Sequence, residues 1–81
     1  MKAHVYVSLK KTVLDPQGKT IHSALQGLGF HGVQGVRQGK HFELELANGL
    51  SPDAARAEVQ RIAEEVLTNP VIEEFSFRLE E

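Results

Sequence analysis

Histidine and carboxylate side chains are the groups in this chain that could bind a metal or move protons. Zinc needs three or four converging ligands, yet the four histidines form no His-x-His or His-x-x-x-His pair. His4 and His41 would share a sheet face only if their strands were neighbours. Glu43 and Glu45 point the same way from one strand, but acid–base work by two carboxylates requires an enclosing pocket. The sequence therefore predicts neither a metal site nor a catalytic pair.

Basic residues beside a glycine could form an anion site. Arg37 and Lys40 flank Gly39, where backbone N–H groups could approach a phosphate. A Walker loop would need Gly-x-x-x-x-Gly-Lys followed by Ser or Thr, and this pattern is absent. Solvated side chains or a partner-docking patch explain Arg37 and Lys40 better than nucleotide binding does.

Length and composition limit the class of protein. The chain has 81 residues and no cysteine, which predicts one domain over residues 1–81 without disulfides. The net charge of −2 divides into about +5 over residues 1–40 and about −7 over 41–81, which argues against a general nucleic-acid binder. The N-terminus alternates and has no signal-peptide pattern, so we expect a soluble, cytoplasmic protein. So small a core also favours self-association.

Two helices are marked at both ends. Asp15 and Ser51 each precede a proline, which is the usual order of an N-cap and a first helical residue. Gly29 can end the first helix in a left-handed conformation. Asn69 and Pro70 end the second, because proline disfavours the helical conformation in the residue before it.

Alternating apolar residues predict strands over residues 3–10, within 31–47 and over 74–79. Residues 37–40 are interpreted first as a hairpin turn, giving the order β-α-β-β-α-β. The alternative is a bulge in one long bent strand, giving β-α-β-α-β. Either order predicts an α+β two-layer sandwich related to the ferredoxin-like fold, with an antiparallel sheet and both helices on one face. The uncovered face would carry Tyr6 and His41, which are candidates for self-association.

Several stretches, taken in order, resemble one known family, the small subunits of phosphoribosylformylglycinamidine synthase (PurS). The resemblance covers nearly the whole chain, and its specificity comes from the order and spacing of the pieces. They are Val5-Tyr6-Val7-Ser8-Leu9-Lys10-Lys11, Val13-Leu14-Asp15-Pro16-Gln17-Gly18, Ala24-Leu25, Leu28-Gly29-Phe30, Val33-Gln34, Val36-Arg37-Gln38-Gly39-Lys40 and Asn69-Pro70-Val71-Ile72-Glu73-Glu74-Phe75.

The resemblance implies a role in de novo purine synthesis, at the step that converts formylglycinamide ribonucleotide, glutamine and ATP to the amidine. It implies a subunit of a glutamine-hydrolysing C–N ligase, with no catalytic residues and no bound cofactor of its own. The complex would use ATP and Mg²⁺. This chain would form a homodimer or homotetramer and bridge the glutaminase and synthetase subunits. Arg37, Lys40, Asn69 and Pro70 are then candidates for docking those partners.

Two other functions remain open from the residues. One is a ferredoxin-like regulatory module that binds a small molecule, since such domains often do so at dimer seams. The other is a small stand-alone enzyme that uses the histidines and glutamates. The bridging hypothesis predicts no turnover by the chain alone.

Overall fold

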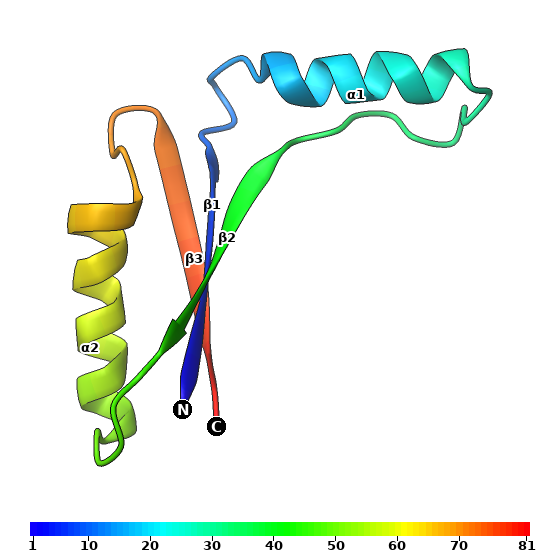
Figure 1. Ribbon diagram of the computed structural model, residues 1–81. Coiled ribbons are helices and arrows are strands. Elements are labelled where there is room, and N and C mark those ends of the chain that lie inside the picture. The colour runs from blue at the N-terminus through cyan, green and yellow to red at the C-terminus, as the bar shows by residue number, and fades with distance from the viewer.

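A computed structural model describes residues 1–81 and contains three strands and two helices in the order β-α-β-α-β (Figure 1). The α+β class is confirmed, and the element order is the alternative one rather than the first choice. The elements are β1 (Lys2–Leu9), α1 (Pro16–Gly27), β2 (Gly39–Glu45), α2 (Pro52–Ile62), which continues as a π-helical turn (Ala63–Leu67), and β3 (Glu73–Glu80).

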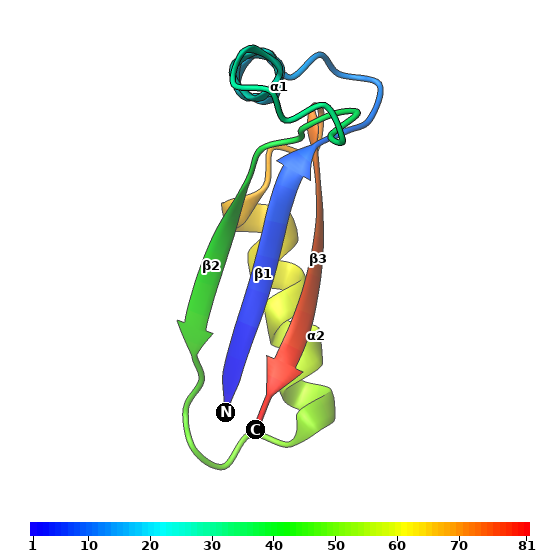
Figure 2. The same ribbon diagram turned by 90° about the vertical axis from the view of Figure 1, so that its right-hand side faces the viewer.

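The sheet has the order β2-β1-β3, and both pairs of strands are antiparallel. Val5 of the central strand pairs with Phe42 on one side and Phe77 on the other. Helix α2 covers one face of this sheet (Figure 2), where Val59 is fully buried. The core consists of one face of β1 and one stripe of α2 and its π-helical continuation: Ala3, Val5, Val7, Val59 and Ala63.

The predicted helix ends are confirmed. The Asp15 side chain accepts a hydrogen bond from Gly18 N, and the Ser51 hydroxyl accepts one from Ala54 N. Gly29 has φ 93°, the left-handed conformation that lets a helix end without a Cβ clash. Neither helix is long and apolar enough to cross a bilayer.

The hairpin predicted at residues 37–40 is wrong. Residues 31–38 form no strand but run back along α1, and β2 begins only at Gly39. The segment is held there by side chains of α1, since the Val33 carbonyl oxygen lies 2.9 Å from His22 Nε2 and 3.2 Å from Gln26 Nε2. These contacts take the place of a strand partner.

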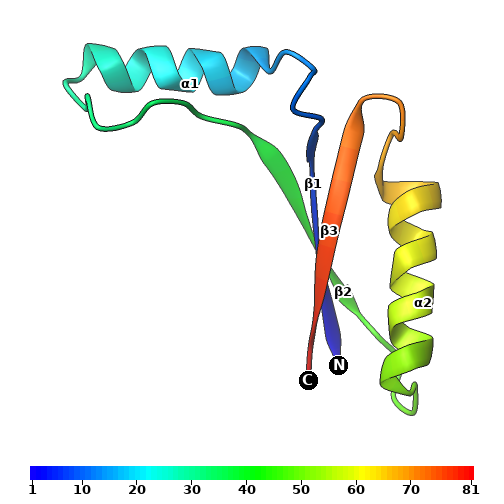
Figure 3. The same ribbon diagram turned by 180° about the vertical axis from the view of Figure 1, so that it is seen from behind.

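The prediction that both helices cover one sheet face is also wrong. Only α2 lies on the sheet, and α1 projects away from its end (Figures 1 and 3). We call residues 10–38 the arm. The helical apolar pattern of α1 is real, but Ile21 and Leu28 remain 41% and 75% exposed because nothing in the chain covers them.

The chain is far more extended than a compact globular domain of its size. Its radius of gyration is 16.1 Å, whereas about 12 Å is usual for this length. Its accessible surface is 5842 Å². This surface exceeds the area typical of a protein of the same mass by about 1000 Å². The arm accounts for this shape, because it adds surface without adding core.

Candidate functional site

The arm meets the sheet at a group of residues that we call the joint: Asp15, Gly18, Arg37 and Gln38. One oxygen of the Asp15 carboxylate, Oδ1, accepts from Gly18 N at 2.9 Å, and the other, Oδ2, accepts from Gln38 N at 2.8 Å. These two backbone hydrogen bonds, Gly18 first, lower the pKa of Asp15, and the Arg37 charge lowers it further. Asp15 is 6% exposed, so its charge is held inside the joint as an anion.

Arg37 connects the segment that returns to the sheet before β2 with the segment that leaves it after β1. Its Nη2 donates to the carbonyl oxygens of Leu9 (3.2 Å), Lys10 (2.9 Å) and Val13 (3.2 Å). Gly18 allows the close packing here, because a Cβ on this residue would collide with the Val36 carbonyl oxygen. The side chain of Arg37, predicted to dock a partner, is thus hydrogen-bonded to backbone carbonyl groups of the same chain.

The corner at Asn69 and Pro70 closes the same end of the sheet. Asn69 Oδ1 accepts from Val71 N at 3.1 Å, and Asn69 N donates to Glu73 Oε1 at 2.7 Å. Lys40 Nζ lies 3.7 Å from Glu73 Oε2. The candidate docking residues are therefore brought to one end of the molecule, and all four are exposed there.

A depression of about 240 Å³ lies where the end of β1, the joint and the start of β3 meet. It is lined by polar groups, among them Gln17, Gln38 and Lys40, and by the already bonded carboxylates of Asp15 and Glu73. The last residues of β1, Val7, Ser8 and Leu9, complete the lining. The depression is large enough to receive a polar side chain.

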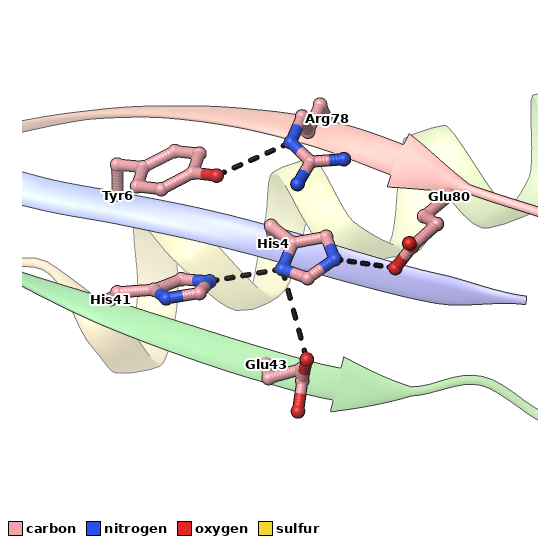
Figure 4. Close-up of polar contacts among 6 residues, drawn as sticks. All are labelled: His4, Tyr6, His41, Glu43, Arg78 and Glu80. Atoms are coloured by element: carbon pink, nitrogen blue, oxygen red, sulfur yellow. Dashed lines mark hydrogen bonds and ion pairs between the residues drawn. The ribbon is translucent and has the colours of Figure 1, made fainter.

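The open face of the sheet carries a second polar cluster (Figure 4). His4 is 5% exposed; its Nε2 donates to Glu80 Oε2 at 2.8 Å, and its Nδ1 lies 2.9 Å from His41 Nε2. Glu43 Oε1 lies 4.0 Å from the same Nδ1. The hydrogen bond from His4 lowers the pKa of Glu80. This cluster spans all three strands.

Tyr6 and His41, predicted on this face for self-association, do lie side by side on it. Their rings stack with centroids 4.9 Å apart, and the Tyr6 hydroxyl accepts from Arg78 Nε at 3.2 Å. That hydrogen bond raises the pKa of Arg78. No group of three or more His, Asp or Glu side chains is arranged to hold a metal ion.

Two features were missed from sequence. The pattern of Asp before proline reveals a helix cap, but nothing local reveals that the second Asp15 oxygen binds Gln38, 23 residues away. The His4–Glu80 contact joins residues 76 positions apart and depends on strand order. Only the alternation that places His4 on the open face could have signalled it.

Comparison with known proteins places the whole chain in one family. Residues 2–81 match the family model described as PurS, phosphoribosylformylglycinamidine (FGAM) synthase. The chain is 41% identical over 80 residues to the PurS subunit of FGAM synthase from Bacillus subtilis, covering 99% of this chain and 93% of that one. It is 43% identical over 79 residues to the Mycobacterium leprae subunit, covering 98% and 95%.

Solved structures of PurS subunits have the same fold as this chain. The Methanocaldococcus jannaschii PurS structure, a subunit of formylglycinamide ribonucleotide amidotransferase in the purine biosynthetic pathway, superposes with a TM-score of 0.87 at 35% identity, covering 99% of this chain and 95% of that one. A chain of the Thermotoga maritima PurLQS structure superposes with a TM-score of 0.75 at 33% identity, covering 95% and 93%. The joint, the arm and the three-stranded sheet thus belong to a protein of the PurS family, the PurS subunits of FGAM synthase in purine biosynthesis.

Proposed function

We propose that this chain is the non-catalytic subunit that joins the glutaminase and synthetase subunits of FGAM synthase. The observation that carries the proposal is that the residues typical of the family are used for internal structure. Asp15 and Arg37 bind backbone groups, and Asn69 forms a corner. A chain that uses these side chains to hold an extended shape is suited to contact two partners at once.

The chemistry is proposed to take place on the partners. Glutamine hydrolysis would supply ammonia on one subunit, and ATP with Mg²⁺ would activate formylglycinamide ribonucleotide on the other. This chain would bind neither ATP nor Mg²⁺, and the complex would work in the cytoplasm. Its contribution would be to hold the two active sites in a productive arrangement.

The chain is further proposed to act as a homodimer through the arm. Leu14, Leu28 and Phe30 are 70%, 75% and 57% exposed, although they belong to the apolar pattern of the arm. The excess surface of about 1000 Å² is close to the roughly 800 Å² per partner that a stable interface buries. A second copy is the partner that this surface fits, because each copy would then cover the other's apolar arm. Pairing through Tyr6 and His41 stays a separate prediction.

Docking of the other subunits is proposed at the joint end of the sheet. All four residues are exposed there, but the side chains of Arg37 and Asn69 are engaged in hydrogen bonds to backbone groups of this chain. Arg37 would therefore support docking through the shape of the joint, and Lys40 and Pro70 would make the contact.

The test is reconstitution with purified glutaminase and synthetase subunits of a PurS-type enzyme. The chain alone should show no turnover. The two other subunits should gain glutamine-dependent FGAM formation when the chain is added, in proportion to its concentration until saturation. Turnover by the chain alone, or full glutamine-dependent activity without it, would refute the proposal.

A further inference from the structure

The arm has little to hold it in place except the joint. Helix α1 makes no extensive contact with the sheet or with α2 (Figures 1 and 2). The chain leaves the sheet after β1 and returns to it before β2, so two backbone segments connect the arm to the body. An arm attached in this way would pivot about these segments unless they were fixed to each other.

The joint fixes them through two side chains. Asp15 belongs to the outgoing segment and binds Gln38 N of the incoming one at 2.8 Å. Arg37 belongs to the incoming segment, and its Nη2 donates to the carbonyl oxygen of Leu9, the last residue of β1, and to those of Lys10 and Val13 in the outgoing segment. In the first connection the side chain comes from the outgoing segment, and in the second it comes from the incoming segment. Sliding one segment along the other would therefore break both connections.

The residue type at position 15 is specified by this double role. The two N–H groups that point at it, from Gly18 and Gln38, need two acceptor atoms. A carboxylate offers two, whereas Ser offers one hydroxyl oxygen and Asn would turn an NH₂ group toward one of the donors. Ser51 caps α2 with one oxygen and makes no second bond. Capping alone therefore explains Ser51 but not Asp15.

We infer that Asp15 and Arg37 are positioning residues that lock the direction of the arm relative to the sheet, and that this locked direction is required for assembly with the glutaminase and synthetase subunits. The second part rests on the proposed function. The first part concerns this chain alone.

The first measurement is the distance between the arm and the body. The chain has no cysteine, so Ser23→Cys on α1 and Arg56→Cys on α2, both exposed, give two selective spin-label sites. Labelled chain diluted into unlabelled chain restricts double electron–electron resonance to distances within one copy. The parent should show a single narrow distance. Asp15→Ser keeps a good helix cap but loses the bond to Gln38, and should lose that narrow distance.

Arg37→Gln is the second variant, and it should broaden the distance in the same way. Ser51→Ala is the matched control: it removes a helix cap of the body without touching the joint, and should leave the distance unchanged. Circular dichroism should show equal helix content in parent and Asp15→Ser. An unchanged narrow distance in both joint variants would overturn the lock.

The second measurement is assembly. In the reconstituted reaction, Asp15→Ser and Arg37→Gln should raise the concentration of this chain needed for half-maximal activity by about tenfold, while Ser51→Ala should not. A broadened distance with unchanged half-saturation would overturn the requirement for assembly and leave the lock standing. A parent chain that gives no glutamine-dependent activity would refute the proposed function, while the distance measurement would still decide the lock.

Discussion

Asp15 accepts a hydrogen bond from the backbone N–H of Gln38 at 2.8 Å, across 23 residues of sequence. This bond joins the start of α1 to the last residue before β2, and so connects two stretches that look independent in the sequence. The stability of the joint therefore depends on groups from both stretches, and the contribution of each residue can be tested by a single substitution.

Gly18 can be tested against Gly27 of the same helix. A Cβ at Gly18 would meet the rigid Val36 carbonyl oxygen. Gly18→Ala should therefore lower the free energy of unfolding by about 1–3 kcal/mol. Gly27 has open space around it. Gly27→Ala should therefore be neutral or stabilise the chain by about 0.5 kcal/mol. Urea unfolding of both variants measures the difference, and equal effects would disprove the tight packing at Gly18.

Acid should weaken the joint. The pKa of Asp15 lies below its usual 3.8 in the folded chain, so its stabilisation is complete above pH 3.8 and is lost as pH falls through the lowered value. The thermal midpoint of the parent should exceed that of Asp15→Ser at pH 7, and the gap should narrow below about pH 4. Asp53→Ser, at a fully exposed side chain, is the control. A gap that stays constant down to about pH 2.5 would contradict the ionised Asp15.

The core can be tested along α2. Val59 is fully buried against β1. Val59→Ala should therefore cost about 2 kcal/mol of unfolding free energy. Val66, on the π-helical turn that follows, is 74% exposed. Val66→Ala should therefore change stability by less than about 0.5 kcal/mol. Chemical denaturation distinguishes the two, and a large effect at Val66 would mean that this side chain is covered in solution.

Self-association should depend on the arm. Leu28→Lys should raise the dimer dissociation constant by about tenfold or more, since a leucine buried at an interface contributes about 2 kcal/mol. Ser23→Lys adds the same charge to an exposed polar site of α1 and serves as the control. Chromatography with light scattering over a concentration series gives both constants.

The rival surface needs its own variant. Tyr6→Ser with His41→Ser changes the open face of the sheet and leaves the arm intact. If this double variant is monomeric while Leu28→Lys remains dimeric, the dimer interface lies on the open face of the sheet rather than on the arm.

Docking of partners should depend on Lys40. Lys40→Glu reverses an exposed charge beside the joint, and should weaken co-purification with the synthetase or glutaminase subunit and make it less sensitive to salt. Lys19→Glu, exposed on α1, gives the same charge change on the arm. Equal recovery of both partners with Lys40→Glu would remove this residue from the docking surface.

Local signals predicted the local structure well. Asp15 and Ser51 cap their helices as expected, because a cap and the N–H groups it satisfies lie close together in the sequence. The alternation in β1 correctly placed His4 and Tyr6 on the open face, and the strand order makes His41 their neighbour. These features need no knowledge of the rest of the chain.

The place of α1 could not be predicted in the same way. An amphipathic helix shows which of its faces avoids water, but not whether the covering surface lies in its own chain. The apolar residues of α1 fit packing on the sheet as well as they fit packing on a second copy. The choice is made by long-range contacts such as Arg37 with Lys10, which no pattern within one element encodes.

The register of the sheet has one more consequence. Lys2 pairs with Glu80 across adjacent antiparallel strands, at the end of the sheet farthest from the joint. The Cα atoms of such a pair lie only about 5 Å apart. A short peptide could therefore connect residue 81 to residue 1, and the polypeptide could be reopened at the exposed Asn48-Gly49 turn. Such a circular permutant would keep every contact of the joint, and its new ends would lie at the same end of the sheet as residues 1 and 81, far from the joint.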